Sequence, residues 1–501
     1  MRKLFLFLSV CSAGYAQAQK IADPKPFANA ITAEDLKKHL YIVASKDFEG
    51  RETATEGQRK AAAYIENHFK SLGLLPGNGN SYQLYYPVFQ DSMTDAGVQV
   101  NGQAFSIDKD FFVNPAANYS SSLMGSEVVF AGYGISDSTR DDYKGVDVRG
   151  KIVLVLNGQP GAAQPQQPAR GRRGNFNAKQ EAAQKNGAVA LLVVQPGFPH
   201  NSAGAKGNMY LSGFKKVNYP NTFYISDKIA QAIMGADYAG INTASPLPKT
   251  YSVNVELNFS KTVLHLQSSD VLGFLEGTDL KDQIVVLSAH YDHLGKRDTV
   301  IYYGADDDGS GTVSILELAS AFAKAKAAGK GPRRSILFLA NSGEEKGLWG
   351  SQYYSEHPTY PLDHTTVDLN IDMIGRIDPN RTKGDSTNYV YVVGSDKLST
   401  DLKTISEGQN KKFTKLELDY KFDDPTDPER IYYRSDHYNF ARKGVPIIFY
   451  FDGIHKDYHR PTDTPDKINY DIMAKRARLV FFTAWDMANR NDMLKRDIPL
   501  K

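Results

Sequence analysis

Residues 284–293 read IVVLSAHYDH, and this stretch decides the fold of the larger part of the chain. A mostly apolar run that is rich in Val and Ile ends directly in His and Asp side chains. Similar runs alternate with helical patterns between residues 256 and 495: the runs are 336–340, 367–371, 389–393 and 447–451, and the helical patterns include 312–327 and 474–487. Because buried parallel strands give near-continuous apolar runs, this alternation predicts an α/β sheet with helices on both faces.

Candidate ligands follow the predicted strands, at the carboxyl ends where such sheets bind ligands. Five segments contribute His or carboxylate groups: 290–293 (HYDH), 304–311 (GADDDGSG), 341–345 (NSGEE), 372–375 (DMIG) and 457–463 (DYHRPTD). One His or Asp at a strand end is usually an ordinary loop residue, but five segments that supply nitrogen or oxygen and no thiol indicate a metal site. Such ligands suit Zn²⁺ or a neighbouring divalent metal. With several carboxylates, one can bridge two ions about 3.5–4 Å apart.

The composition narrows the class of protein. The 501 residues include 59 Lys and Arg against 57 Asp and Glu, a net charge of +2 that argues against a nucleic-acid binder or a polybasic membrane-surface protein. An apolar fraction of 41% is too high for a disordered chain, and a single cysteine excludes a disulfide framework and a Cys-rich zinc module. The length exceeds the roughly 250–300 residues that one core usually supports, which predicts two domains or one domain with a large insertion.

The first 18 residues have the pattern of a secretory signal. Arg2 and Lys3 precede an apolar run at 4–10, and Ala16-Gln17-Ala18 is a typical cleavage sequence. Lipoprotein processing at Cys11 is a less favoured alternative, because the residue before it is a bulky valine. No later run approaches the roughly 18 apolar residues that span a bilayer. We therefore expect an exported protein, periplasmic or secreted, with no membrane span.

The remaining chain divides into three segments by its sequence pattern. We expect residues 19–115 and 256–501 to form one catalytic domain, and residues 116–255 to be inserted into it. In this middle segment, short strands predicted at 127–130, 151–156 and 188–194 alternate with turns, and a helix is predicted at 178–185.

The motifs also identify a family. HYDHLG, GADDDGSG, NSGEEKGLWGS, NIDMIG and YHRPTD occur in the order found in secreted bacterial zinc aminopeptidases with co-catalytic metals, and residues 30–110 and 256–490 resemble that family. Its relatives include glutamate carboxypeptidase and the glutaminyl cyclases. Residues 120–250 resemble a protease-associated (PA) domain, notably in GKIVLVLNG and KQEAAQKNGAVALLVV. The resemblance implies a mixed sheet covered by helices on both faces, with a β-rich PA domain inserted.

The same resemblance implies roles for the motif residues. Two zinc ions per chain would be held by five ligands: His290 and Asp372 for one ion, Glu345 and His459 for the other, and Asp307 as the bridge. Glu344 would be the general base that takes a proton from the attacking water and delivers it to the leaving amine. Asp292 would orient His290 by a hydrogen bond.

Other polar residues near these motifs have less specific expectations. Asp463 is expected to orient His459, and His293 is expected to be a polar loop residue rather than a ligand. The segment with the SDH element is a candidate wall of the substrate pocket, because the family also contains it; its side chains are Tyr433, Arg434, Asp436 and His437. The alternative is that these side chains only fix the loop by hydrogen bonds.

We therefore expect a metallo-exopeptidase that removes N-terminal residues from peptides, with no nucleic-acid partner. Three alternatives stay open. A glutaminyl-peptide cyclase uses the same scaffold with a single zinc, and a carboxypeptidase would attack the other end of the peptide. A non-catalytic peptide-binding protein is the alternative from another class, although it would not need a free glutamate beside a metal ligand. The inserted domain is expected to border the active-site cleft and to limit substrate size.

Overall fold

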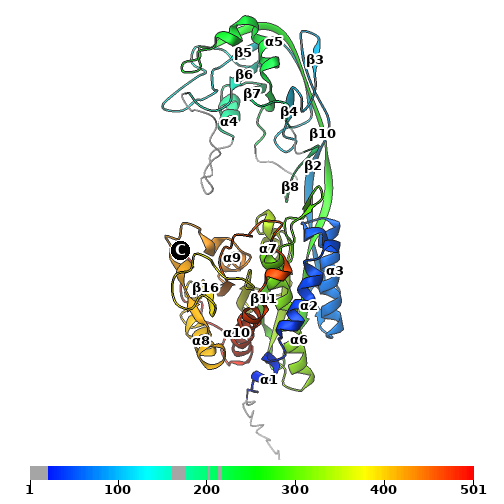
Figure 1. The fold of residues 1–501 in the computed structure, drawn as a ribbon, viewed down its shortest axis with the longest axis vertical. Helices are drawn as coiled ribbons and strands as arrows, with labels where there is room; N and C mark the ends of the chain where they lie inside the picture. The colour runs from blue at the N-terminus through cyan, green and yellow to red at the C-terminus, as the bar shows by residue number, and fades with distance from the viewer. Residues whose placement is uncertain (1–20, 161–176, 201–203, 213–216, 501) are drawn as a thin grey trace, which may run out of the picture. The chain divides into compact units, whose positions relative to one another are not determined.

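The computed structural model describes residues 21–160, 177–200, 204–212 and 217–500. These residues form two compact units, one comprising the chain up to Leu84 and from Ser269 onward, the other Tyr85–Ser268 (Figure 1). The second unit is wider than the insertion expected at 116–255, because it includes nearly all of β2 (Gln83–Val100) and most of β10 (Lys249–Leu275). The expected signal at residues 1–18, with Cys11, lies outside the described residues, so export stays a prediction.

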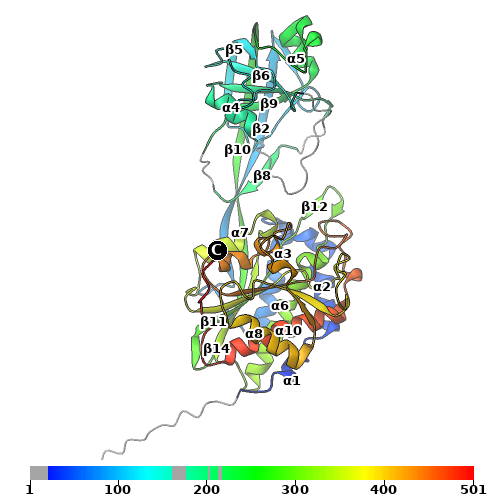
Figure 2. The ribbon, with the colours of Figure 1, turned by 90° about the vertical axis from the view of Figure 1, so that its left-hand side faces the viewer.

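The first unit is built on a mixed sheet (Figure 2). Its strands in chain order are the C-terminal part of β10, β11 (Leu280–His290), β14 (Arg334–Asn341), β15 (Thr365–Ile371), β16 (Tyr389–Val393), β17 (Glu417–Asp419) and β18 (Ile447–Phe451). Their order across the sheet is β17-β16-β18-β15-β11-β14-β10. The central strand β11 is parallel to β14 and β15, and β15 is parallel to β18, whereas β10 and β16 are antiparallel to their neighbours β14 and β18. The short strand β1 (Leu75–Pro76) pairs with β10 at the edge.

Helices cover both faces of this sheet because side chains alternate along each strand. Val285, Leu287 and Ala289 of β11 belong to one buried cluster, whereas Ile284 and Val286 belong to another. The first cluster includes residues of α2 (Ala33–Val43), α3 (Glu56–Ser71), α6 (Gly311–Ala327) and α10 (Tyr470–Asn489); the second includes residues of α7 (Trp349–Glu356) and α9 (His437–Ala441). The predicted mixed α/β sheet with helices on both faces is therefore confirmed.

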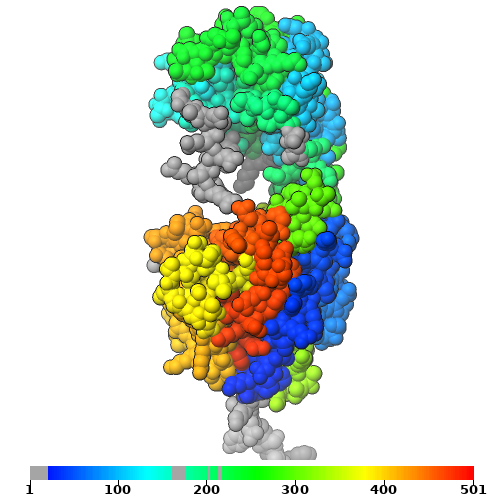
Figure 3. Space-filling model, in the orientation of Figure 1, coloured from blue at the N-terminus to red at the C-terminus, as the bar shows by residue number. Residues whose placement is uncertain are grey.

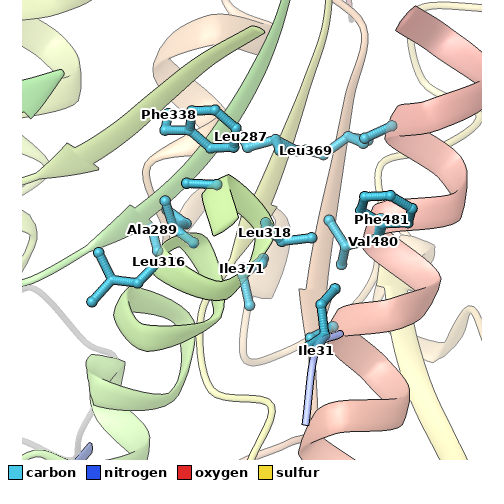
Figure 4. Close-up of a cluster of buried hydrophobic side chains, with 14 of the residues drawn as sticks. Ile31, Leu287, Ala289, Leu316, Leu318, Phe338, Leu369, Ile371, Val480 and Phe481 are labelled. Atoms are coloured by element: carbon cyan, nitrogen blue, oxygen red, sulfur yellow. The ribbon is translucent and has the colours of Figure 1, made fainter. Parts of the chain in front are cut away.

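Apolar side chains fill much of the space between the sheet and two of these helices. Figure 4 shows Leu287 and Leu369 of the sheet beside Leu318 of α6 and Phe481 of α10. All four side chains have no exposed surface. Burying a side chain of this size stabilises the fold by about 1.5–3 kcal/mol, so this layer holds α6 and its preceding loop firmly against β11.

The N-terminal helices pack against the C-terminal helix. Figure 3 shows the N-terminal segment in blue beside the C-terminal segment in red on the surface of this unit. The guanidinium of Arg478 in α10 donates two hydrogen bonds, of 3.0 and 2.7 Å, to the carbonyl oxygen of Ile31. The unit also contains α1 (Lys25–Ala28) and α8 (Leu402–Gln409). No helix of the described residues is both long and apolar enough to cross a membrane.

The second unit has its own core, and its strands continue the same hydrogen-bonded path through β10. Its strands are β2, β3 (Gln103–Phe105), β4 (Phe111–Val113), β5 (Ser121–Phe130), β6 (Ile152–Leu156), β7 (Ala190–Val194), β8 (Lys206–Tyr210), β9 (Asn221–Ile225) and the N-terminal part of β10. The path β10-β5-β6-β7-β9-β4 contains a parallel centre, from β5 to β9. The helices α4 (Ala178–Lys185) and α5 (Asp227–Met234) complete the unit.

Candidate metal centre

The three central parallel strands bring their carboxyl ends to one edge of the sheet. β11 ends at His290, which is paired in register with Asn341 at the end of β14. The chain continues from β14 into the short helix η4 (Glu344–Lys346), and from β15 directly into Asp372. The loop before α6 folds as η3 (Ala305–Ser310) and carries Asp307. The fold therefore gathers four of the five predicted segments at this edge.

Two groups of side chains meet at Asp307. On one side, His290 Nε2 lies 3.3 Å from Asp307 Oδ1 and 3.7 Å from Asp372 Oδ1. On the other side, His459 Nε2 lies 3.0 Å from Asp307 Oδ2 and 3.0 Å from Glu345 Oε2. The two oxygens of Asp307 thus face two different histidine–carboxylate pairs.

The unsatisfied atoms of this cluster fit a metal ion. His290 Nε2, Asp307 Oδ2, Glu345 Oε1 and Asp372 Oδ1 are buried and have no hydrogen-bond partner in the described part of the chain. Buried polar atoms normally have partners, so this concentration at one place requires an explanation. Two sets of residues have ligand atoms close enough to hold an ion: His290, Asp308 and Asp372, and His293, Asp307 and Glu345. Neutral imidazole and carboxylate together are a donor set that suits zinc.

Asp308 is better explained as a structural residue than as a ligand. Its Oδ1 accepts hydrogen bonds from the backbone N–H groups of Gly311 and Met373, at 2.8 and 3.1 Å. Its Oδ2 accepts one from the backbone N–H of His290, at 3.2 Å. One carboxyl group therefore ties together the ends of β11 and β15 and the start of α6, which fixes the three loops around the site.

The close packing of these carboxylates and imidazoles shifts the pKa values of Asp307 and Glu344. Burial would raise the pKa of Asp307, but the adjacent imidazoles of His290 and His459 outweigh it and hold that pKa well below its usual value. Burial also raises the pKa of Glu344 well above its usual value; His290 opposes the shift, and the carboxylates of Glu345 and Asp372 add to it. A bound cation favours ionised carboxylates and so would lower the pKa of Glu344.

The carboxylate of Asp292 is hydrogen-bonded to the backbone of Glu344. Asp292 Oδ1 accepts a hydrogen bond of 3.2 Å from the backbone N–H of Glu344. His290 Nδ1 lies 3.1 Å from the carbonyl oxygen of Asp292 and 3.6 Å from its carboxylate. The hydrogen bond that orients His290 is thus made by the carbonyl of Asp292, while the carboxylate holds the turn that carries Glu344.

Two other residues differ from their expected surroundings. Asp463 Oδ2 accepts hydrogen bonds from the backbone N–H groups of Asp306 and Asp307, at 3.0 and 3.2 Å, so it supports the bridging loop, whereas we expected it to orient His459. His293 is fully buried, and its Nδ1 lies 2.7 Å from Glu345 Oε1. His293 therefore belongs to the cluster, which sequence reasoning missed. Its place in the HYDH motif, three residues after His290, was the available signal.

A pocket opens beside Glu344. Its lining combines acidic, apolar and cationic side chains: Asp307, Glu344, Asp372, Met373, Ile431, Arg434, Phe449, Phe451, Ile454 and Tyr458. Of the four side chains expected in a pocket wall, Arg434 is in this lining and Tyr433 is exposed at 41% nearby in sequence. Asp436 and His437 require a correction, because both are fully buried. Asp436 accepts a 2.5 Å hydrogen bond from Ser351, and His437 Nε2 lies 2.8 Å from the carbonyl oxygen of Tyr432. Both side chains therefore make contacts in the interior and do not line the pocket.

Comparison with known families agrees with this site. Residues 270–484 match peptidase family M28, and residues 117–233 match the PA domain. The first match contains all five predicted metal ligands, and the second lies inside the second compact unit. A match to the PA domain thus lies in the segment that interrupts the first unit, and a match to peptidase family M28 follows it.

Individual relatives support the family and the fold. A probable leucine aminopeptidase of Arthroderma otae is 32% identical over 217 residues, which are 42% of this chain and 56% of that protein. The chain thus spans little more than half the length of the curated relatives it matches. Among solved structures, an aminopeptidase from Aneurinibacillus sp. strain AM-1 has a TM-score of 0.56 at 20% identity, covering 96% of this chain and all of that one. A zinc aminopeptidase from Bacillus subtilis has a TM-score of 0.54 at 19% identity, covering 94% and 99%. These two structures share the fold.

Proposed function

We propose that this chain is a two-zinc aminopeptidase that hydrolyses the N-terminal residue from peptides. The observation that carries the proposal is the arrangement at Asp307, whose two carboxylate oxygens each face a separate histidine–carboxylate pair. His290 and Asp372 would hold one ion, Glu345 and His459 the other, and Asp307 would contact both. This is the division that the sequence motifs implied.

Glu344 is the side chain best placed to act as general base. Zinc in such a site supplies Lewis-acid polarisation of a carbonyl oxygen and lowers the pKa of a nearby water. Glu344 lines the pocket, and its Oε2 lies 3.8 Å from His290 Nε2, farther than any contact that Glu345 makes with His293 and His459. Glu344 would take the proton of the attacking water and return it to the leaving amine.

The pocket supports a preference for apolar N-terminal side chains. Met373, Ile431, Phe449, Phe451 and Ile454 form its apolar wall. The carboxylates of Glu344 and Asp372 lie at the same pocket and would attract the free ammonium group of the substrate. Leucine-like and aromatic N-terminal residues should therefore be removed faster than charged ones.

One observation favours a second candidate, a carboxypeptidase. The pocket lining includes Arg434, whose guanidinium donates a 3.2 Å hydrogen bond to the hydroxyl of Tyr458. An arginine at this place could also bind the terminal carboxylate of a peptide. The glutaminyl-cyclase alternative is less consistent with the structure, because a single-zinc enzyme does not need two histidine–carboxylate pairs around one bridging aspartate.

Blocked peptides would decide between these activities. The zinc-loaded protein is incubated with a leucyl peptide, its N-acetylated form, its C-amidated form and an N-terminal Gln peptide, and the products are identified by mass spectrometry. We expect loss of the N-terminal residue, which acetylation abolishes and amidation leaves unchanged. The reverse dependence on blocking would favour a carboxypeptidase, and loss of ammonia from the Gln peptide without hydrolysis would favour a cyclase. Tight peptide binding without any product would favour a binding protein.

A further inference from the structure

Arg51 is an arginine buried beneath the metal centre. It ends the short helix η1 (Lys46–Arg51) and has no exposed surface. Its guanidinium donates four hydrogen bonds, all to backbone carbonyl oxygens: Nε to Tyr291 at 2.7 Å, Nη1 to Val43 at 2.9 Å and Tyr303 at 2.8 Å, and Nη2 to Gly304 at 2.9 Å. No motif assignment used this residue.

Three of the four carbonyl groups belong to the segments that carry the metal ligands. Tyr291 follows His290 directly in the chain, and Tyr303 and Gly304 precede the loop that holds Asp307. Val43 is the last residue of α2 and provides an anchor outside both loops. One rigid cation thus links the loop of a terminal ligand to the loop of the bridging ligand. A guanidinium can do this because its five N–H donors have a fixed planar geometry, which a lysine ammonium lacks.

The backbone around Arg51 has left-handed residues and close contacts with the loop after His290. Glu49 and Arg51 have φ angles of 49° and 53°, and such left-handed conformations are unfavourable for residues other than glycine. The segment also pairs with the loop after His290, because His293 and Gly295 donate backbone hydrogen bonds to the carbonyl oxygens of Arg51 and Gly50, at 3.3 and 3.0 Å. A Cβ atom at Gly50 would lie 2.4 Å from two carbonyl oxygens of the neighbouring loop, so the fit is tight.

Thr53 extends this support to the acidic side chains. Its hydroxyl donates a 2.6 Å hydrogen bond to Asp292 Oδ2, and the other oxygen of Asp292 accepts the backbone N–H of Glu344. Burial lowers the pKa of Arg51 to about 10, while Asp292 and Asp308 act in the opposite direction, so the guanidinium stays charged at neutral pH.

We propose that Arg51 and Thr53 are positioning residues for the metal centre. Arg51 fixes the loops of His290 and Asp307 relative to each other. Thr53 fixes the Asp292 carboxylate, which in turn accepts the backbone N–H of Glu344. This inference rests on the proposed zinc site. A purely structural role would instead make Arg51 equivalent to any other buried arginine that binds carbonyl groups.

Arg334 offers a matched control for that comparison. It is also fully buried, at the start of β14 and therefore at the opposite end of that strand from Asn341. Its guanidinium donates to the carbonyl oxygens of Met487, Arg490 and Asn491, at 2.9, 2.6 and 3.0 Å. Arg334→Lys should lower stability about as much as Arg51→Lys without touching the site.

The test measures metal binding by the full chain, not only its activity. Zinc affinity is determined by competition with a chromophoric chelator, and the geometry at the metal is followed by the visible absorption of Co²⁺-loaded protein. We expect Arg51→Lys to weaken zinc binding at least tenfold and to change the Co²⁺ spectrum, whereas Arg334→Lys changes neither. Thr53→Val, which keeps the shape of the side chain, should weaken zinc binding about threefold and lower kcat more than it changes KM.

The outcomes separate this inference from the proposed function. A wild-type chain without zinc affinity would overturn both. Zinc binding and a Co²⁺ spectrum that Arg51→Lys leaves unchanged would overturn this inference alone, as would equal effects of Arg51→Lys and Arg334→Lys on zinc affinity. If Arg51→Lys does not fold, Thr53→Val decides: wild-type affinity, spectrum and kcat in that variant would contradict the proposal.

Discussion

Glu344 and Glu345 are neighbours in sequence but have different surroundings. Glu345 contacts His293 at 2.7 Å and His459 at 3.0 Å, whereas Glu344 comes only within 3.8 Å of His290. We expect Glu344→Gln to keep both zinc ions and to lose about 10²–10⁴-fold in kcat, because it removes a proton acceptor and not a ligand. Turnover of a leucyl anilide and metal content by mass spectrometry measure the two effects.

The paired variant Glu345→Gln is the control for that prediction. It removes a charged ligand, so it should lose metal content together with activity. Near-normal turnover by Glu344→Gln would show that another group acts as the base, and loss of zinc from Glu344→Gln would make Glu344 a ligand.

Asp368 gives a pH-dependent prediction that does not involve the metal ligands. It lies in β15 without exposed surface and accepts a 2.6 Å hydrogen bond from Ser288. Burial raises the pKa of Asp368 to about 8, against about 3.9 in an unfolded chain. A raised folded-state pKa means that the folded protein binds the proton more tightly. The stability contributed by the neutral carboxyl group is therefore complete below about pH 4 and is lost as the pH rises through 8.

We expect Asp368→Asn to remove this pH dependence, because an amide does not titrate. The free energy of unfolding of the wild type should fall relative to that of the variant between pH 5 and pH 8, by at most roughly 4 kcal/mol. Urea denaturation of the metal-free protein at several pH values measures the difference. Asp363→Asn, which changes an exposed carboxylate, is the control and should show no such trend. A constant difference between wild type and Asp368→Asn would show that Asp368 is ionised in the fold.

At the scale of elements, the sequence predicted the strands that are buried on both faces. The apolar run at 389–393 is β16 itself, and the run at 367–371 lies within β15. Both are recognisable because nearly every side chain of such a strand is buried. The long strand β10 was not recognised, since it is largely exposed before Ser268: buried positions alternate only over 253–259, and none occurs over 260–267. The chain therefore leaves the inserted unit later than the predicted boundary at 255.

The site residues also divide into those that the sequence predicted and those that it did not. The five proposed ligands were found because their residue types and their places after strands are both distinctive. The roles of Arg51 and Asp463 were not predicted, since each acts on backbone groups more than 150 residues away, and no local pattern records such a contact. His437 was misplaced for a related reason: a histidine in a loop motif does not reveal whether it faces the pocket or, as here, stacks on Phe449.

The start of α2 provides a prediction at this scale. Thr32 precedes the helix and accepts a 3.1 Å hydrogen bond from the backbone N–H of Asp35, and its hydroxyl donates to the Asp35 carboxylate at 2.7 Å. We expect Thr32→Ala to destabilise the first unit by about 1 kcal/mol, because a helix N-terminal N–H loses its partner. Chemical denaturation measures the loss, and Thr32→Ser should retain most of the stability. Equal losses in both variants would attribute the effect to the methyl group of Thr32 and not to the cap.

At the scale of the whole molecule, the two units have separate cores. The buried clusters around β11 contain no residue between 85 and 268, and those of the second unit contain only residues from that range. All five proposed ligands belong to the first unit. The segments that enter and leave the insertion also meet within the first unit: Leu272 donates a 2.7 Å backbone hydrogen bond to Tyr82, and the hydroxyl of Ser269 donates to Gln83 at 2.9 Å.

This arrangement predicts that the first unit folds and binds metal without the insertion. Because residues 82–83 lie beside residues 269–272, a short Gly-Ser linker from Leu84 to Ser269 closes a small loop at little entropic cost. We expect the shortened chain to bind two zinc ions with wild-type affinity and to cleave a leucyl dipeptide at a rate within about threefold of the full chain.

If the insertion limits substrate size, the ratio of rates for a ten-residue peptide and a dipeptide should rise on deletion, whereas a linker placed within β11 should abolish folding. A folded deletion variant that binds no zinc would mean that the second unit contributes to the site, and an unchanged ratio of rates would exclude its role in selecting peptide length.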